Sequence, residues 1–295
     1  MLCAAVFLLL LLSKTVNLVG IASNTTEAYL SLTAVQLFVF MLPCVLYIRY
    51  RSLDMRTQLR VRMFSPDKIM FTVLCALLLI LSSMLISTLD TSIGNSVYSW
   101  GYLLGEDSID HSGINVLYYA ICFALLPALC EEILFRGVIM SEYQHSSIAA
   151  AVFINSLFFA MLHFEIEKLP FYFFAGLVLT MCAYAANSIV ASMITHLLYN
   201  LFAIFGGKVV STTASALGDV TLIRIVLTVL FLLMLMLCFG ECQRIYASYA
   251  RKNRPSDYLP QAKSRDGAVR FFSALLSPMA LICIVIYIVS AFLLK

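Results

Sequence analysis

Nine apolar runs occupy most of this chain, and they constrain its fold more than any other feature. Several of them reach the ~20 residues that an α-helix needs to cross the hydrocarbon core of a bilayer. Hydrophobic residues make up 62% of the 295 residues and charged residues only 12%, whereas soluble domains carry about 25% charged residues. This composition leaves too little polar surface to keep the chain in water. The sequence therefore predicts an all-α, polytopic membrane protein.

The expected membrane spans follow one another with short polar connections. The first run lacks the basic residues that precede the apolar part of a signal peptide, so we interpret it as a span and leave cleavage open. We see no internal repeat and expect one membrane domain over residues 1–295. The nine spans are placed at residues 2–22, 28–48, 69–89, 114–143, 148–164, 171–186, 189–205, 221–240 and 271–294.

Basic residues are concentrated in two of the connections. Residues 49–68 and 241–270 hold 13 of the 19 Lys and Arg residues. Cytoplasmic loops of membrane proteins carry such an excess, and nine spans put both segments in the cytoplasm if the N-terminus is cytoplasmic as well. We expect anionic membrane lipid as the partner of these loops. No nucleic-acid motif accompanies them, so no nucleic-acid partner is expected.

Three ionisable side chains interrupt the apolar run that ends at Met140. They are Glu131, Glu132 and Arg136. Ionised groups at membrane depth cost several kcal/mol unless they are paired or in contact with water. Glu132 and Arg136 have the i, i+4 separation of a helical ion pair, whereas Glu131 is rotated about 100° away from Glu132. We therefore assign Glu131 to a reacting centre and Glu132 to pairing with Arg136.

Two histidines follow in the next apolar runs. Glu131 and His163 lie equally far, 16 residues, on either side of Ser147, which predicts a similar depth for both if the helices that flank this turn are antiparallel. His196 is expected about 10 Å shallower, from the position of its helix start and the 1.5 Å rise per residue. Asn155, Phe159 and His163 share one helix face by their i, i+4, i+8 spacing. For Asn155, hydrogen bonding between helices is favoured over site lining.

These motifs resemble those of a known family. Glu-Glu-x-x-x-Arg, Phe-x-x-x-His and His-x-x-x-Asn, in this order on successive membrane helices, look like the CAAX-protease and bacteriocin-processing family, which includes the type II CAAX prenyl endopeptidases and the Abi-type proteins. The resemblance covers about residues 114–205, which we take as the catalytic core, with flanking spans in residues 1–113 and 206–295. The matching positions are Glu131, Glu132, Arg136, Phe159, His163, His196 and Asn200.

The resemblance implies hydrolysis of a peptide bond inside the membrane, in a bacterial plasma membrane. Glu131 with His163 would activate a water as general base, and His196 with Asn200 would donate hydrogen bonds to the oxyanion. Glu132, Arg136 and Phe159 would support the site. Zinc is a possible cofactor, because Glu131, His163 and His196 offer three ligands with water as the fourth. The chain has no His-Glu-x-x-His, so glutamate and metal catalysis both stay open.

Two other functions would keep the same polar cluster. A membrane immunity or partner protein would use it as a binding pocket without catalysis. A proton-coupled transporter would use buried Glu and His as a relay, but such transporters are typically built from inverted repeats with paired broken helices, and we see neither. Hydrolysis of a membrane-associated or precursor peptide, reached from the bilayer or from the cytoplasmic face, is the function the sequence favours.

Overall fold

The all-α fold predicted from the apolar runs is confirmed. The structure, a computed structural model, describes residues 2–16, 25–89, 113–143, 148–206, 220–251 and 267–293, and these contain helices and no strand. Five of their helical stretches are long and apolar enough to cross a membrane, at 29–51, 66–88, 116–143, 169–186 and 220–251, and four apolar helices are shorter. Each expected span contains a helix, whereas the number of true crossings and the cytoplasmic N-terminus stay predictions.

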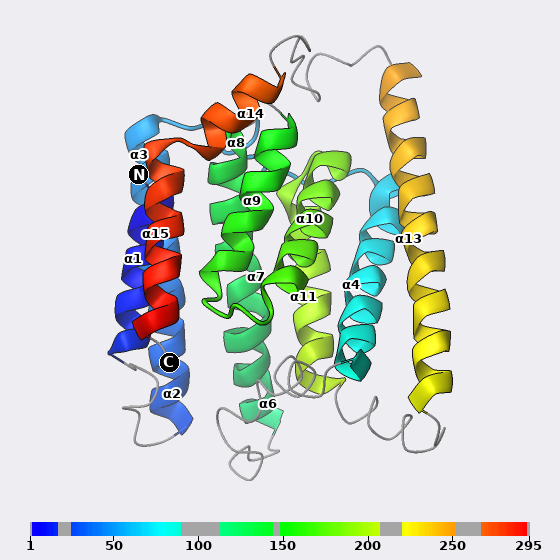
Figure 1. Ribbon diagram of the computed structural model, residues 1–295, viewed down its shortest axis with the longest axis horizontal. Coiled ribbons are helices and arrows are strands. Elements are labelled where there is room, and N and C mark those ends of the chain that lie inside the picture. Colours follow the sequence, from blue (N-terminus) through cyan, green and yellow to red (C-terminus); the bar gives the residue numbers. More distant parts are fainter. Residues whose placement is uncertain are drawn as a thin grey trace.

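The helices form one bundle whose members are roughly parallel or antiparallel to each other, except α14, which lies obliquely across one end (Figure 1). In chain order they are α1 (Leu2–Thr15), the continuous α2–η1–α3 (Thr25–Val35, Gln36–Met41, Leu42–Arg51), η2 (Pro66–Lys68) with α4 (Ile69–Leu89), the continuous α6–η5–α7–η6–α8 (Gly113–Ala120, Ile121–Leu125, Leu126–Glu132, Ile133–Ile139, Met140–Tyr143), α9 (Ile148–Leu162), α10 (Leu169–Ala186), α11 (Ile189–Phe205), α13 (Val220–Arg251), α14 (Gly267–Leu275) and α15 (Pro278–Leu293).

The packing order places the motif helices in the middle of this bundle. At one side, α1 packs against α15, and α15 also contacts α9. At the other side, α13 packs against α4, which in turn contacts α10 and α11. The segments α7, α9, α10 and α11 lie between these two sides, and η1 contacts α7 from the N-terminal part of the chain. A polar site on the central helices is thereby surrounded by apolar helices.

Two of the three π-helical segments found among the described residues precede a proline. The segment η1 ends two residues before Pro43, and η5 ends two residues before Pro127. Proline has no amide hydrogen and its ring clashes with the carbonyl four residues earlier, so the turn before it widens. The third segment, η6, contains Arg136, and its Phe135 carbonyl accepts a hydrogen bond from Asn155 at 2.5 Å. Single π-helical turns of this kind occur frequently at functional sites.

The C-terminal spans differ from the expectation in two ways. The helix α13 continues to Arg251, well past the expected end at residue 240, because charged residues mark the end of an apolar run without ending a helix. The expected span 271–294 is divided between α14 and α15, because the helix is interrupted at residues 276–277, just before Pro278. The first helix ends at Thr15, and residues 17–22 of its expected span lie outside the described residues.

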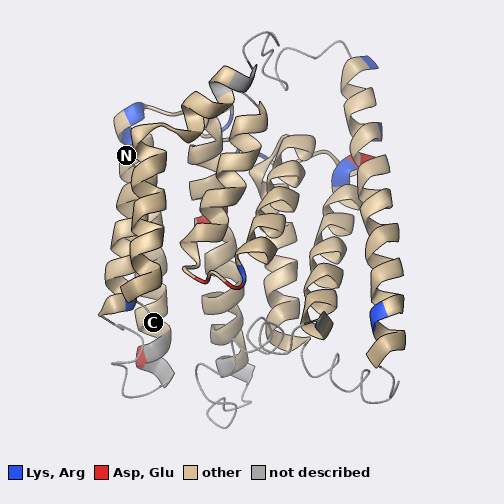
Figure 2. Cartoon of the chain, viewed as in Figure 1, with Lys and Arg blue, Asp and Glu red and all other residues tan. Residues whose placement is uncertain are grey.

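The described residues of the two basic segments lie at the same end of the bundle. Lys and Arg gather near the ends of α3, α4 and α13 that face the same way in Figure 2. A direct contact joins the two segments, because the Nη2 of Arg244 donates to the carbonyl of Asp67 at 2.8 Å. Near the opposite end of α13, the Nε of Arg224 donates to the carbonyl of Thr88, also at 2.8 Å. Arg224 and Arg244 of α13 therefore bond to the two ends of the continuous η2–α4 segment.

Candidate active site

The carboxylate of Glu131 lies in a cavity between the central helices. Glu131 is on α7, one turn after Pro127, and only 8% of its surface is exposed. The cavity has a volume of about 90 Å³, well above the ~10–15 Å³ that one water occupies by this measure. The Oε2 of Glu131 is buried and has no hydrogen-bond partner among the described residues. A buried acceptor of this kind requires a partner such as water or a ligand.

Glu132 points away from this cavity into a buried ion pair. Its Oε1 lies 2.6 Å from the Nη1 of Arg136, and both side chains are fully buried, so the pair expected from the i, i+4 spacing is present. The same Oε1 lies 3.0 Å from the Nδ1 of His196. The Nη2 of Arg136 donates to the carbonyl of Gly176 at 3.1 Å, which connects the pair to α10.

Arg136 also lies over the ring of Phe159, 4.5 Å from the ring centroid. The edge of the same ring contacts both histidines, with centroid distances of 5.1 Å to His163 and 5.8 Å to His196. Phe159 is 2% exposed. The Phe-x-x-x-His motif thus places one aromatic ring in contact with Arg136 and with both imidazoles.

His163 lies in the turn that ends α9, with its ring held from two sides. Its Nδ1 is 2.9 Å from the carbonyl of Phe159, and because a carbonyl only accepts, this nitrogen carries the proton. The Nε2 of neutral His163 is therefore an acceptor. The ring stacks on Tyr172 of α10 with a centroid distance of 3.7 Å and an angle of 11°. Lys14 of α1 donates to the backbone carbonyl of His163 at 2.8 Å.

The expected 10 Å difference in depth between His196 and the glutamates is wrong. The 3.0 Å contact between His196 and Glu132 places them at one depth. The expected depth counts from the start of α11, which follows α10 directly after the connection formed by Asn187 and Ser188. Part of the loop 52–65 covers this connection, since the amide of Ile189 donates to the carbonyl of Arg60 at 3.1 Å.

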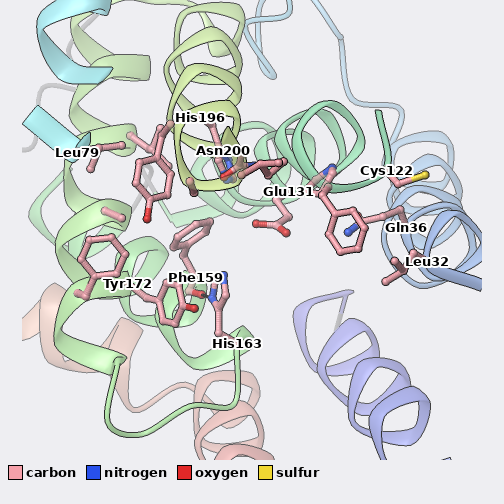
Figure 3. A pocket seen from close by; sticks show the side chains of 18 residues that line it. Leu32, Gln36, Leu79, Cys122, Glu131, Phe159, His163, Tyr172, His196 and Asn200 are labelled. Atoms are coloured by element: carbon pink, nitrogen blue, oxygen red, sulfur yellow. Dashed lines mark hydrogen bonds between the residues drawn. The ribbon is translucent and has the colours of Figure 1, made fainter. Parts of the chain in front are cut away.

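The structure brings five of the seven motif residues to one cavity. Glu131, Phe159, His163, His196 and Asn200 line it, as Figure 3 shows, while the other two, Glu132 and Arg136, form the ion pair behind it. The Nδ2 of Asn200 makes only a long contact, 3.4 Å, with the carbonyl of Ala124. Its amide hydrogens therefore remain able to bind a ligand in the cavity.

Asn155 does not line the cavity. It is fully buried, and it bonds the Phe135 carbonyl and, at 3.4 Å, the hydroxyl of Thr180. These contacts join α9 to η6 and α10. Asn155 therefore connects helices, the role that the sequence favoured for it.

Sequence reasoning missed three polar side chains of the cavity wall, those of Gln36, Tyr172 and Tyr199. Tyr172 lies in an aromatic-rich apolar run, where nothing in the sequence distinguishes a stacking tyrosine from a packing one. Gln36 is the one amide side chain within its predicted span, 28–48. An uncharged amide in the middle of an apolar span was the signal that could have identified it.

The three expected zinc ligands do not form a metal site as they are placed here. Within the described ranges, no three His, Cys, Asp or Glu side chains come together closely enough to hold a metal ion. We therefore derive no step through a metal, and zinc binding by Glu131, His163 and His196 stays a prediction.

The fold and the site together define an integral membrane protein with a buried acid–histidine centre. Residues 113–202, from α6 through most of α11, match the family model described as type II CAAX prenyl endopeptidase Rce1-like, in agreement with the resemblance that the motifs carry. The family implies a protease, and therefore a hydrolase. No curated protein and no solved structure gives a significant match to the chain.

Proposed function

We propose that this protein is an intramembrane endopeptidase in which Glu131 and His163 activate a water. The observation that carries the proposal is the shared cavity, which holds the unpaired Oε2 of Glu131 and the His163 ring on facing sides (Figure 3). Both groups are acceptors in this arrangement, and a water donates two hydrogen bonds. A water held between them is oriented with its lone pair free to attack a carbonyl carbon.

The chemical steps follow from these positions. The water oxygen bonds to the scissile carbonyl carbon while Glu131 takes one of its protons. In the tetrahedral intermediate the former carbonyl oxygen is negatively charged. When the C–N bond breaks, the proton on Glu131 passes to the leaving nitrogen, so one water is consumed and a carboxyl and an amine end are produced.

The oxyanion would be stabilised by Asn200 and His196. The Nδ2 of Asn200 can donate a hydrogen bond without any change of protonation. The Nδ1 of His196 carries a proton because it faces the ionised Glu132, so the Nε2 donates only when His196 is an imidazolium. The Glu132 carboxylate stabilises that positive charge. Preorganised donors of this kind contribute several kcal/mol in a site that excludes water.

The substrate is proposed to be a membrane-associated or precursor peptide, because the cavity is surrounded by apolar helices. The family description points to prenylated CAAX ends, and the bacteriocin-processing resemblance points to unmodified precursor peptides. In either case membrane lipid surrounds the protein, and we place it in a bacterial plasma membrane.

The test uses purified protein in lipid vesicles with internally quenched peptides, one set ending in a farnesylated CAAX sequence and one set unmodified. We expect the wild type to cleave peptides of at least one set. Glu131→Gln keeps the shape of the side chain but removes the base, and it should lower kcat by about 10²–10⁴-fold. Peptide binding without cleavage by the wild type would support the non-catalytic alternative, and wild-type turnover by Glu131→Gln would refute the role of Glu131.

A further inference from the structure

Gln36 adds a polar group to the cavity from outside the family-matched residues. It is the first residue of the π-helical turn η1, in the N-terminal span, whereas the family match begins at residue 113. Its side chain lines the same cavity as Glu131. The π-helical turn widens the helix before Pro43, and Gln36 lies where this widening begins.

The amide oxygen of Gln36 has no protein partner in the part of the chain that the structure describes. Its Oε1 is buried, as is the Oε2 of Glu131, and both atoms lack a hydrogen bond. A buried acceptor without a partner is destabilising. Since the side chain is uncharged and lines the cavity, its Oε1 can accept a hydrogen bond from a partner that enters the cavity.

The position of Gln36 indicates which partner fits. Figure 3 shows its amide end pointing past a phenyl ring toward the Glu131 carboxylate, on the side of the cavity away from His163 and Tyr172. The wall around Gln36 is apolar and includes Leu32, Cys122 and Phe123. The side-chain amide is the one group on this wall that offers both donors and an acceptor.

A peptide main chain has the complementary chemistry. Each of its residues carries one N–H donor and one C=O acceptor, and both need partners when they are away from water. A side-chain amide can accept from such an N–H through Oε1 and donate to such a C=O through Nε2. Gln36 can therefore satisfy a stretch of substrate main chain that an apolar wall would leave unpaired.

We propose that Gln36 binds the main chain of the peptide substrate beside the scissile bond. The proposal rests on the proposed endopeptidase function and extends it to a substrate-binding residue. Gln36 holds the peptide in register with the water on Glu131 and takes no part in proton transfer. Its loss therefore raises KM more than it lowers kcat.

The test compares three proteins in vesicles of one lipid composition. Gln36→Met keeps the length of the side chain without its hydrogen bonds, and Thr33→Val is the matched control. Thr33 lies on the same helix and contacts Cys122 at 3.4 Å, but it does not line the cavity. Thermal unfolding midpoints are measured first, and Gln36→Glu, which keeps the accepting oxygen, is the second variant if Gln36→Met does not fold.

The substrates are the internally quenched peptide that the wild type cleaves and a series in which one backbone N–H at a time, near the scissile bond, is N-methylated. We expect Gln36→Met to raise KM about 3- to 10-fold, as loss of one or two hydrogen bonds predicts, with kcat within about 2-fold. N-methylation at one position should raise the KM of the wild type and of Thr33→Val but leave the KM of Gln36→Met unchanged. Gln36→Glu should keep the sensitivity of the wild type at that position.

Three results would overturn the proposal. An unchanged KM in Gln36→Met is the first, and equal sensitivity of Gln36→Met and the wild type to every N-methyl group is the second. A loss confined to kcat is the third, because it would indicate a role in the chemical step or a structural role. If the wild type cleaves no peptide of either kind, the proposed function itself fails, and the role of Gln36 fails with it.

Discussion

The Nδ1 of His196 lies 3.0 Å from the Oε1 of Glu132, on the same oxygen that Arg136 contacts at 2.6 Å. One buried oxygen thus fixes a residue of the cavity and neutralises an arginine. Glu132 acts on the site through His196, since its own carboxylate faces the ion pair. Both stability and turnover therefore depend on Glu132.

We expect Glu132→Gln to destabilise the protein strongly. Removing one partner of a buried ion pair leaves the other charge uncompensated and costs roughly 3–5 kcal/mol. The measurement is the thermal unfolding midpoint in detergent. The control is Glu142→Gln, because Glu142 pairs with Arg51 at 3.6 Å where both side chains are partly exposed, and such pairs contribute about 0–1 kcal/mol. A Glu132→Gln protein as stable as the control would contradict the structural role of the ion pair, and if it were also inactive it would confine the role of Glu132 to turnover.

The stacking of Tyr172 on His163 predicts a difference between two substitutions. Tyr172→Phe keeps the ring and should retain near-wild-type turnover. Tyr172→Ala removes the ring and should lower turnover about 2- to 10-fold, because aromatic pairs contribute about 0.5–1.5 kcal/mol beyond their burial. Steady-state cleavage of the quenched peptide measures both. An equal loss in both variants would show that the hydroxyl, not the stacking, matters.

Gly176 is expected to tolerate no side chain. A Cβ there would lie 2.8 Å from the Cα of Ser156, so Gly176→Ala must push α10 away from α9, at a cost of about 1–3 kcal/mol. The displacement would also move the carbonyl that accepts from Arg136. Gly240→Ala is the matched control, because a Cβ at Gly240 meets nothing within 4 Å and alanine favours helix by about 1 kcal/mol. Equal unfolding midpoints for the two variants would contradict this packing.

Metal dependence is tested by chelation of purified protein whose metal content has been measured beforehand. The described His, Cys, Asp and Glu side chains form no group of three that could hold a metal, and the proposed water activation uses Glu131 and His163 alone. We therefore expect peptide cleavage to survive a strong zinc chelator. Loss of activity that zinc restores would show that the ligands rearrange around a metal.

The sequence predicted those parts of the site that depend on spacing within one helix. The Glu132–Arg136 pair follows from i, i+4 geometry, and Phe159 and His163 share a face for the same reason. The contact between His196 and Glu132 could not be predicted, because it depends on how deep the α10–α11 connection lies. Tyr172 could not be recognised either, since helices that are apolar on every face give no periodic signal for their rotation. The π-helical turns at Gln36 and Arg136 also change which side chains face inward.

The hydrogen bonds from the arginines of α13 to the two ends of the η2–α4 segment have a consequence for the lipid environment. Arg224 and Arg244 hold the two ends of α4, and at 1.5 Å per residue they are about 30 Å apart, which equals the thickness of a typical bilayer core. Arginine side chains prefer the headgroup region. We therefore expect the distance between Arg224 and Arg244 to match the thickness of a bilayer of one acyl-chain length. Since α4 contributes Leu79 to the cavity, we expect peptide cleavage to peak at one phosphatidylcholine chain length and to fall in thinner and thicker vesicles. Loss of this peak in Arg224→Gln would show that Arg224 contributes to the dependence on bilayer thickness. An activity that is independent of chain length in the wild type would exclude such a dependence.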